Sequence, residues 1–143
     1  MHEGSSTVAA FVAEPISAAA GIHIPHPEYW STIREICDRH GVLLISDEVI
    51  TGFGRTGKLF AMEQWGVKPD IFTVAKGLTS GYLPIGATVV SGRIADAFIG
   101  SSETTFQHLF TFGGNPASCA AGLATLQIML GDAMVDTTAQ MGE

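Results

Sequence analysis

Charged side chains directly follow three short apolar stretches of the sequence. Glu14, the pair Asp47 and Glu48, and Lys76 each come at the end of such a stretch. In an open α/β sheet the carboxyl ends of the parallel strands lie at one edge, and ligands bind beyond that edge. The pattern therefore favours a binding or catalytic site there. The simpler alternative, that each charged residue only marks where a buried strand reaches solvent, stays open for any one of them.

Lys76 is the residue best suited to covalent chemistry. It follows five apolar or β-favouring residues, whereas Lys58 lies in a glycine-rich loop and Lys68 precedes a proline. A lysine at the lip of an apolar pocket can offer a neutral, nucleophilic amine that forms a Schiff base with a carbonyl compound. Asp47, at the end of a neighbouring stretch, is then placed to keep the nitrogen of a heterocyclic cofactor protonated.

Residues 52–57, GFGRTG, match the GxGxxG pattern of dinucleotide-binding loops. Asp70 lies 18 residues after Gly52, near the spacing of about 20 that this fingerprint uses for its acidic residue. The fingerprint also needs a helix that begins at the third glycine, and Lys58 and Leu59 carry no helix-capping signal. A nicotinamide-binding protein is therefore the weaker alternative.

Two other motifs carry less information. His23 and His26 lie three residues apart among prolines, but no third ligand is near, so we expect a solvated loop and no metal. Residues 111–116, TFGGNP, precede a helical pattern. A hydroxyl and free backbone N–H groups at a helix entry suit a phosphate, although the same residues are also common in turns.

The apolar stretches predict buried strands, and helical spacing predicts helices between them. Near-continuous apolar strands are typical of a parallel sheet covered on both faces, so the expected fold is α/β with three layers in the order α, β, α. Only about ten residues link Lys76 to the fourth stretch, without a helical pattern, so that strand is expected to run antiparallel. The expected strands are residues 8–13, 42–46, 71–75 and 86–91, and the expected helices are residues 28–40, 59–65, 93–99 and 116–130.

Composition narrows the class of protein. The chain has 143 residues, 46% of them hydrophobic and 15% charged, which predicts a globular chain and argues against intrinsic disorder. Its net charge of −7 disfavours binding to nucleic acid or to an anionic membrane surface. No apolar run is long enough to span a bilayer, and residues 1–6 do not look like a signal peptide, so a cytoplasmic protein is expected. Cys37 and Cys119 are expected to be buried free thiols.

Four segments together resemble the class III aminotransferases, which are pyridoxal-phosphate enzymes of fold type I. The segments are AEP at 13–15, SDEVITGFGRTGKLFAMEQWGVKPDI at 46–71, AKGLTSGYLPIGATVVS at 75–91 and TFGGNP at 111–116. The resemblance implies that residues 1–143 form the central part of the cofactor-binding large domain. The N-terminal segment and the C-terminal small domain of the family are expected to lie outside this sequence, and a chain without them is expected to have little activity.

The resemblance also implies roles for individual residues. Lys76 carries pyridoxal 5′-phosphate as a Schiff base and moves the proton between substrate and cofactor. Asp47 pairs with the pyridine nitrogen, Val49 packs against the ring, and Thr111 binds the cofactor phosphate of the neighbouring subunit in a homodimer. Glu14 is expected on the substrate side.

The sequence gives partial information about the substrate. Ile50 stands where ornithine and γ-aminobutyrate branches of the family carry glutamine, which favours either the amine and ω-amino acid:pyruvate branch or the diaminopelargonate branch. Leu109 departs from a glycine that many members have near Thr111. Transfer of an amino group from an amine or ω-amino acid to a 2-oxo acid is the leading prediction. An aminomutase or racemase with the same cofactor is the enzymatic alternative, and an inactive fragment is the non-enzymatic one.

Overall fold

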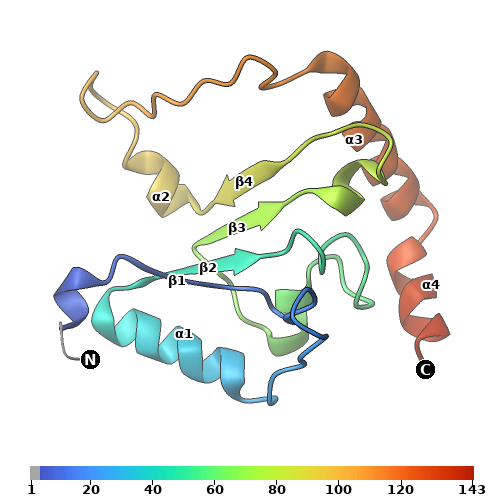
Figure 1. Ribbon diagram of the computed structural model, residues 1–143, viewed down its shortest axis with the longest axis horizontal. Helices are drawn as coiled ribbons and strands as arrows, with labels where there is room; N and C mark the ends of the chain where they lie inside the picture. The colour runs from blue at the N-terminus through green and yellow to red at the C-terminus, as the bar shows by residue number, and fades with distance from the viewer. Residues whose placement is uncertain (1–3) are drawn as a thin grey trace.

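The chain folds around a four-stranded mixed sheet with the strand order β1-β2-β3-β4 (Figure 1). The computed structural model describes residues 4–143. β1 (Ala10–Ala13), β2 (Leu43–Asp47) and β3 (Ile71–Val74) are parallel to one another, and β4 (Ala87–Val90) is antiparallel to β3. The α/β class and the direction of the fourth strand are therefore confirmed.

The link from β3 to β4 explains that direction. It contains only a short 3-10 helix, η3 (Lys76–Thr79), in a stretch for which the sequence predicted no helix. One such turn is too short to cross the sheet, so the chain comes back beside the strand it has just left. The resulting register sets Thr73 opposite Asp47 of β2 on one side and Thr88 of β4 on the other.

Helix α1 (Tyr29–His40) packs against the sheet and builds the core. Its side chains Trp30 and Cys37 are buried together with Leu44 of β2. The indole N–H of Trp30 donates a hydrogen bond to the carbonyl oxygen of Pro15 at 3.0 Å, which ties the helix to the chain after β1. Gly41 ends the helix in a left-handed conformation, as a glycine at this position usually does.

The remaining helices frame the two ends of the sheet. Asn115 caps the helix that begins at Pro116, because its side-chain oxygen accepts a hydrogen bond from the Ser118 N–H at 3.1 Å. Only a narrow strip of that helix is buried, so Cys119 is exposed and the expectation that it is buried is wrong. Cys37 is buried, and both thiols are free. These further elements are η1 (Ser5–Thr7), η2 (Ala61–Trp65), α2 (Gly92–Asp96), α3 (Pro116–Gly131) and α4 (Met134–Met141).

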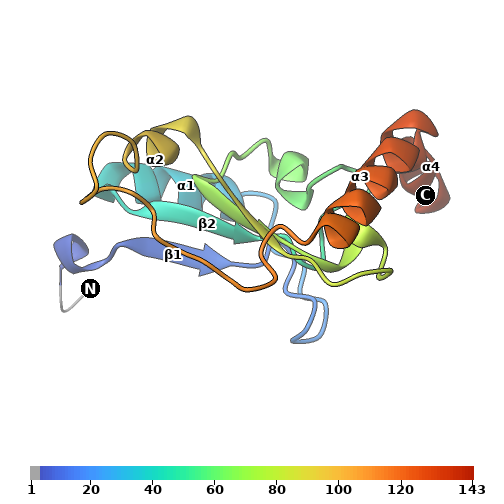
Figure 2. The same cartoon turned by 90° about the horizontal axis from the view of Figure 1, so that it is seen from above.

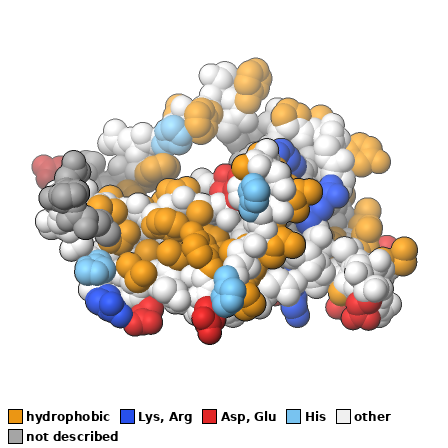
Figure 3. Space-filling view, turned by 60° about the horizontal axis from the view of Figure 1, so that its bottom comes forward, with side chains coloured by type: hydrophobic (Ala, Val, Ile, Leu, Met, Phe, Trp, Pro, Cys, Tyr) orange, Lys and Arg blue, Asp and Glu red, His pale blue; other side chains and the backbone are white. Residues whose placement is uncertain are grey.

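The side of the sheet away from α1 is more open. Val12 of β1 has 61% of its surface exposed, and all residues of β4 are exposed. Figure 2 shows α1 and the chain between α2 and α3 on opposite sides of the sheet. Hydrophobic side chains gather in a broad area of the face that Figure 3 brings forward.

Among residues 4–143 no single helix has the length and hydrophobicity to cross a membrane; only the bent pair α3 and α4, taken together, meets both criteria.

Glu48, directly after β2, is a charged residue that is only 1% exposed. Its carboxylate accepts hydrogen bonds from the Thr51 hydroxyl at 2.6 Å and from the backbone N–H groups of Ala61 and Met62 at 3.0 and 2.9 Å. These bonds replace the water that a buried charge loses. They fasten the first turn of η2 to the end of β2.

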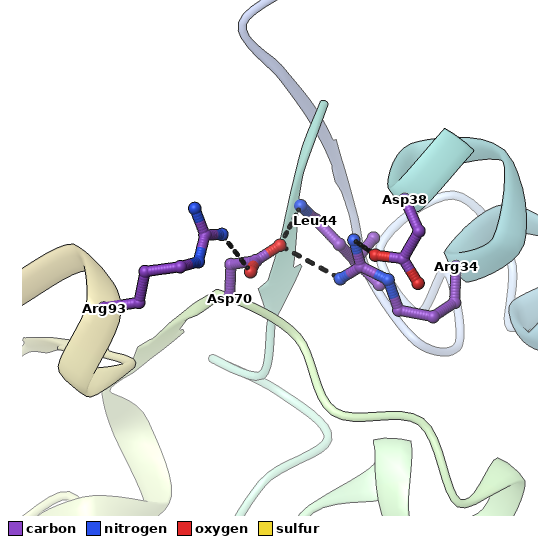
Figure 4. Close-up of polar contacts among 5 residues, drawn as sticks. All are labelled: Arg34, Asp38, Leu44, Asp70 and Arg93. Carbon is purple, nitrogen blue, oxygen red and sulfur yellow. Dashed lines mark hydrogen bonds and ion pairs between the residues drawn. The ribbon is translucent and has the colours of Figure 1, made fainter. Parts of the chain in front are cut away.

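Asp70, directly before β3, joins four elements (Figure 4). Its carboxylate accepts hydrogen bonds from the Leu44 N–H at 2.9 Å, from Arg34 of α1 at 3.0 Å and from Arg93 of α2 at 2.8 Å. Burial by itself raises the pKa of Asp70, but these three bonds outweigh it and hold the pKa below its ordinary value. Asp70, the acidic residue that the dinucleotide-binding hypothesis needed, is therefore engaged in structural contacts.

Replacing Glu48 with glutamine should destabilise the fold. The variant loses the charge-assisted character of three buried hydrogen bonds, and its amide group brings an extra donor toward backbone donors. We expect Glu48→Gln to lower the free energy of unfolding by about 1.5–3 kcal/mol in urea titrations at neutral pH. Glu103→Gln, at an exposed position, should change it by less than about 0.5 kcal/mol. Equal effects of the two variants would contradict the structural role of Glu48.

Replacing Asp70 with asparagine should give a loss of stability that depends on pH. A lowered pKa in the folded state means that the ionised carboxylate stabilises the fold in full above the ordinary pKa of about 3.9, and that this contribution fades as the pH falls through the lowered value. We expect Asp70→Asn to cost about 1–3 kcal/mol near neutral pH. In urea titrations the difference from the wild type should shrink below about pH 3.9. A difference that does not change with pH, or that matches the exposed variant Asp132→Asn, would contradict this assignment.

Candidate active site

The parallel strands bring three of the predicted site residues to one edge of the sheet. The register pairs Ala13 of β1 with Ser46 of β2, so Glu14 follows β1 at the level where Asp47 ends β2. Lys76 comes two residues after the end of β3, the strand that pairs with β2. The backbone positions of all three residues therefore follow the carboxyl ends of adjacent parallel strands.

Asp47 is half-buried and has one carboxylate oxygen engaged. Its Oδ1 accepts a hydrogen bond from the Val49 N–H at 3.0 Å and another from the Thr73 hydroxyl at 3.1 Å. Its Oδ2 accepts no hydrogen bond from the described residues 4–143. Side chains alternate along a strand, so Asp47 faces away from the buried side on which Glu48 is held. The carboxylate thus has a fixed orientation and one free oxygen.

Lys76 occupies an unusual backbone conformation. Its φ angle is 35°, in a region that residues other than glycine rarely adopt, at a cost of about 1–3 kcal/mol. The next residue must be small, because a Cβ on Gly77 would lie only 3.1 Å from the Cβ of Phe53. Lys76 is exposed, and its amine forms no ion pair or hydrogen bond within the described part of the chain.

A groove of about 670 Å³ runs past Lys76 between η3, α3 and α4. Its wall includes the charged side chain of Arg55 and the largely apolar side chains of Tyr82 and Met129. Lys76 also lines a smaller hollow of about 320 Å³, together with Thr79 and Leu83. Asp47 lines neither of them.

The other predicted residues lie in the loops that follow β1 and β2 and in the chain before α3. The Glu14 carboxylate accepts a hydrogen bond from the Ala18 N–H at 3.0 Å, within its own loop. Val49 is half-buried next to Asp47. Thr111 is exposed in the chain between α2 and α3, which arches away from β4 (Figure 1). His23 and His26 are both exposed, as expected of a solvated loop.

The GFGRTG segment does not have the structure of a dinucleotide-binding loop. No helix begins at Gly57, and the chain continues in turns as far as η2. Gly54 and Gly57 have φ angles of 86° and 76°, and a Cβ on Gly57 would lie 2.9 Å from the Cβ of Ala139 in α4. The glycines are therefore required by the turns and by the close approach of α4.

Thr73 is the polar contact of the site that sequence reasoning missed. It lies within an apolar strand, where a lone threonine fits β-propensity and calls for no further explanation. Only the pairing of Thr73 with Asp47 gives it significance.

Comparisons with known proteins agree with this architecture. The family model for class III aminotransferases matches residues 1–143. A beta-alanine–pyruvate aminotransferase of Pseudomonas aeruginosa is 42% identical over 145 residues, which cover 99% of this chain and 32% of that protein.

Solved structures agree as well. The crystal structure of an aminotransferase from Bacillus anthracis superimposes with a TM-score of 0.94 at 50% identity, over 99% of this chain and 32% of that one. An amine transaminase from an uncultivated Pseudomonas species, solved in its PLP-bound form, gives a TM-score of 0.93 at 46% identity, with the same coverage of 99% and 32%. The chain thus spans about a third of the length of each of these proteins. The full-length family match and these similarities show that the chain belongs to the class III aminotransferase family.

Proposed function

We propose that the protein is a pyridoxal-phosphate-dependent aminotransferase that moves an amino group from an amine or ω-amino acid to a 2-oxo acid. The observation that carries the proposal is the pair formed by Asp47 and Lys76. They stand at the ends of neighbouring parallel strands, one with a free carboxylate oxygen and the other with an unpaired amine.

These residues fit the cofactor by their chemistry. The free Oδ2 of Asp47 is an acceptor suited to the N–H of a protonated pyridine ring. The Lys76 amine is available for a covalent bond to an aldehyde. Val49 offers an apolar surface beside Asp47 for one face of the ring, and the exposed Thr111 hydroxyl is available to a phosphate of a partner copy in a homodimer.

When bound, the cofactor supplies a conjugated ring that accepts the electrons released at the substrate carbon. Lys76 would take the proton from the substrate carbon that bears the amino group and give it to the carbon of the cofactor that had carried the aldehyde, as general base and then general acid. Asp47 would hold the ring nitrogen protonated with its negative charge, which matters most when electrons reach the ring. Glu14 would contribute on the substrate side.

Two observations favour the proposed substrates. The relative from Pseudomonas aeruginosa is named for a β-amino acid and pyruvate, and the similar Pseudomonas structure is named an amine transaminase. Ile50, next to the aspartate strand, cannot donate the hydrogen bond that glutamine gives in ornithine-type enzymes. A requirement for a 2-oxo acid acceptor would separate this activity from an aminomutase or a racemase.

Lys76 should be the single site of cofactor attachment. We expect the full polypeptide that the gene encodes, incubated with pyridoxal phosphate and reduced with borohydride, to show one adduct, which peptide mass spectrometry places on Lys76. Lys76→Ala should show no adduct at one equivalent per chain. Lys68→Ala, at an exposed position outside the site, should be labelled to the same extent as the wild type. An adduct of equal yield in Lys76→Ala would remove this lysine from its proposed role.

Asp47 should matter for the rate more than for the fold. Asp47→Asn keeps the size of the side chain and an oxygen that accepts from Val49, but it loses the charge that stabilises the protonated ring. We expect kcat/KM with β-alanine and pyruvate to fall about 100-fold or more. The melting temperature should change little, and Asp132→Asn, an exposed control, should keep the wild-type rate. A near-normal rate in Asp47→Asn would exclude the proposed contact.

A further inference from the structure

Thr73 makes a side-chain hydrogen bond to the carboxylate of Asp47 across the pairing of β2 and β3. Its hydroxyl donates to Oδ1 at 3.1 Å, the same oxygen that accepts from the Val49 N–H at 3.0 Å. The two residues are direct partners in the register, so both side chains point to the same face of the sheet. Within residues 4–143 these are the hydrogen bonds that the Asp47 carboxylate accepts.

The two bonds act on different degrees of freedom. The Val49 N–H belongs to the turn that follows Asp47, and it holds Oδ1 close to the backbone of its own segment. The Thr73 hydroxyl comes from another strand and fixes the direction of the carboxylate relative to β3, the strand that leads to Lys76. With both donors on Oδ1, the carboxylate presents Oδ2 as its free acceptor.

We propose that Thr73 is a positioning residue, whose hydroxyl holds the Asp47 carboxylate so that Oδ2 faces the nitrogen of the bound pyridine ring. The inference rests on the proposed function for the cofactor. The contact between Thr73 and Asp47 belongs to the protein itself and can be tested without a cofactor. Thr73 does not touch the reacting atoms, so its effect passes through Asp47.

The first test measures the contact in the cofactor-free protein. The Val49 amide donates to the oxygen that Thr73 holds, so its hydrogen exchange reports how firmly the carboxylate is fixed. Thr73→Val keeps the shape and the β-branched side chain but removes the hydroxyl, and it should speed exchange at Val49 about tenfold. Thr73→Ser restores the donor and should return exchange to near the wild-type rate. Thr73→Ala serves as a second hydroxyl-free variant should the valine disturb packing.

Thr88 provides a matched control. It lies directly opposite Thr73 on β4, on the same face of the sheet, and its hydroxyl has no hydrogen bond to Asp47. Thr88→Val should leave exchange at Val49 unchanged. Unchanged exchange in Thr73→Val and Thr73→Ala, or equal acceleration in Thr88→Val, would overturn the proposal.

The second test measures ligand affinity by calorimetry with pyridoxamine 5′-phosphate, which binds without a covalent bond to lysine. We expect Thr73→Val to weaken binding about tenfold, and Thr73→Ser to bind within about twofold of the wild type. In an Asp47→Ala background, Thr73→Val should have no further effect, because its route through the carboxylate is gone. An undiminished effect in that background would overturn the positioning role.

The two tests separate the two claims. If the wild type itself fails to bind pyridoxamine 5′-phosphate, the proposed function is wrong, while exchange at Val49 still decides whether Thr73 holds the carboxylate. If the ligand binds and Val49 exchange does not respond to the loss of the hydroxyl, the proposed function stands and the role of Thr73 is refuted.

Discussion

The buried carboxylate of Glu48 determines how the end of β2 presents its side chains. Three hydrogen bonds hold it on the buried side of the strand, beside η2. Because successive side chains of a strand point to opposite faces, Asp47 must point to the other face of the sheet, where it lies opposite Thr73 of β3. A shift of the register by one residue would bury Asp47 and expose Glu48. The hydrogen bonds of the buried Glu48 therefore stabilise the register that leaves Asp47 on the open face.

The turn that carries Lys76 is supported by the GFGRTG segment and by α3. Lys76 has a positive φ angle, and such strain persists only where the surroundings enforce it. Gly77 packs against Phe53 of the GFGRTG segment, and η3 lies against α3. The glycine-rich segment therefore packs against the Lys76 turn. This is a structural role and not the phosphate binding of a dinucleotide fingerprint.

Much of the architecture could be predicted from short-range patterns. Apolar runs gave the strands, Gly41 gave the end of α1, and the short link after Lys76 gave the antiparallel strand. Sequence alone could not separate Glu48 from Asp47, because both follow the same apolar run and only the contacts of η2 show which is buried. The hydroxyl of Thr73 and the exposure of Cys119 depend likewise on which elements pack together, which local spacing does not encode.

The arrangement also keeps Asp47 and Lys76 from neutralising each other. Asp47 and Lys76 have opposite charges at one sheet edge, yet no ion pair joins them among residues 4–143. Had they paired directly, a ligand would have to break that pair before it used either group. Val49 and Thr73 satisfy one oxygen of Asp47 with neutral donors, and Lys76 starts a separate turn beyond the end of β3. Neither group therefore has to be released from the other before a ligand binds it.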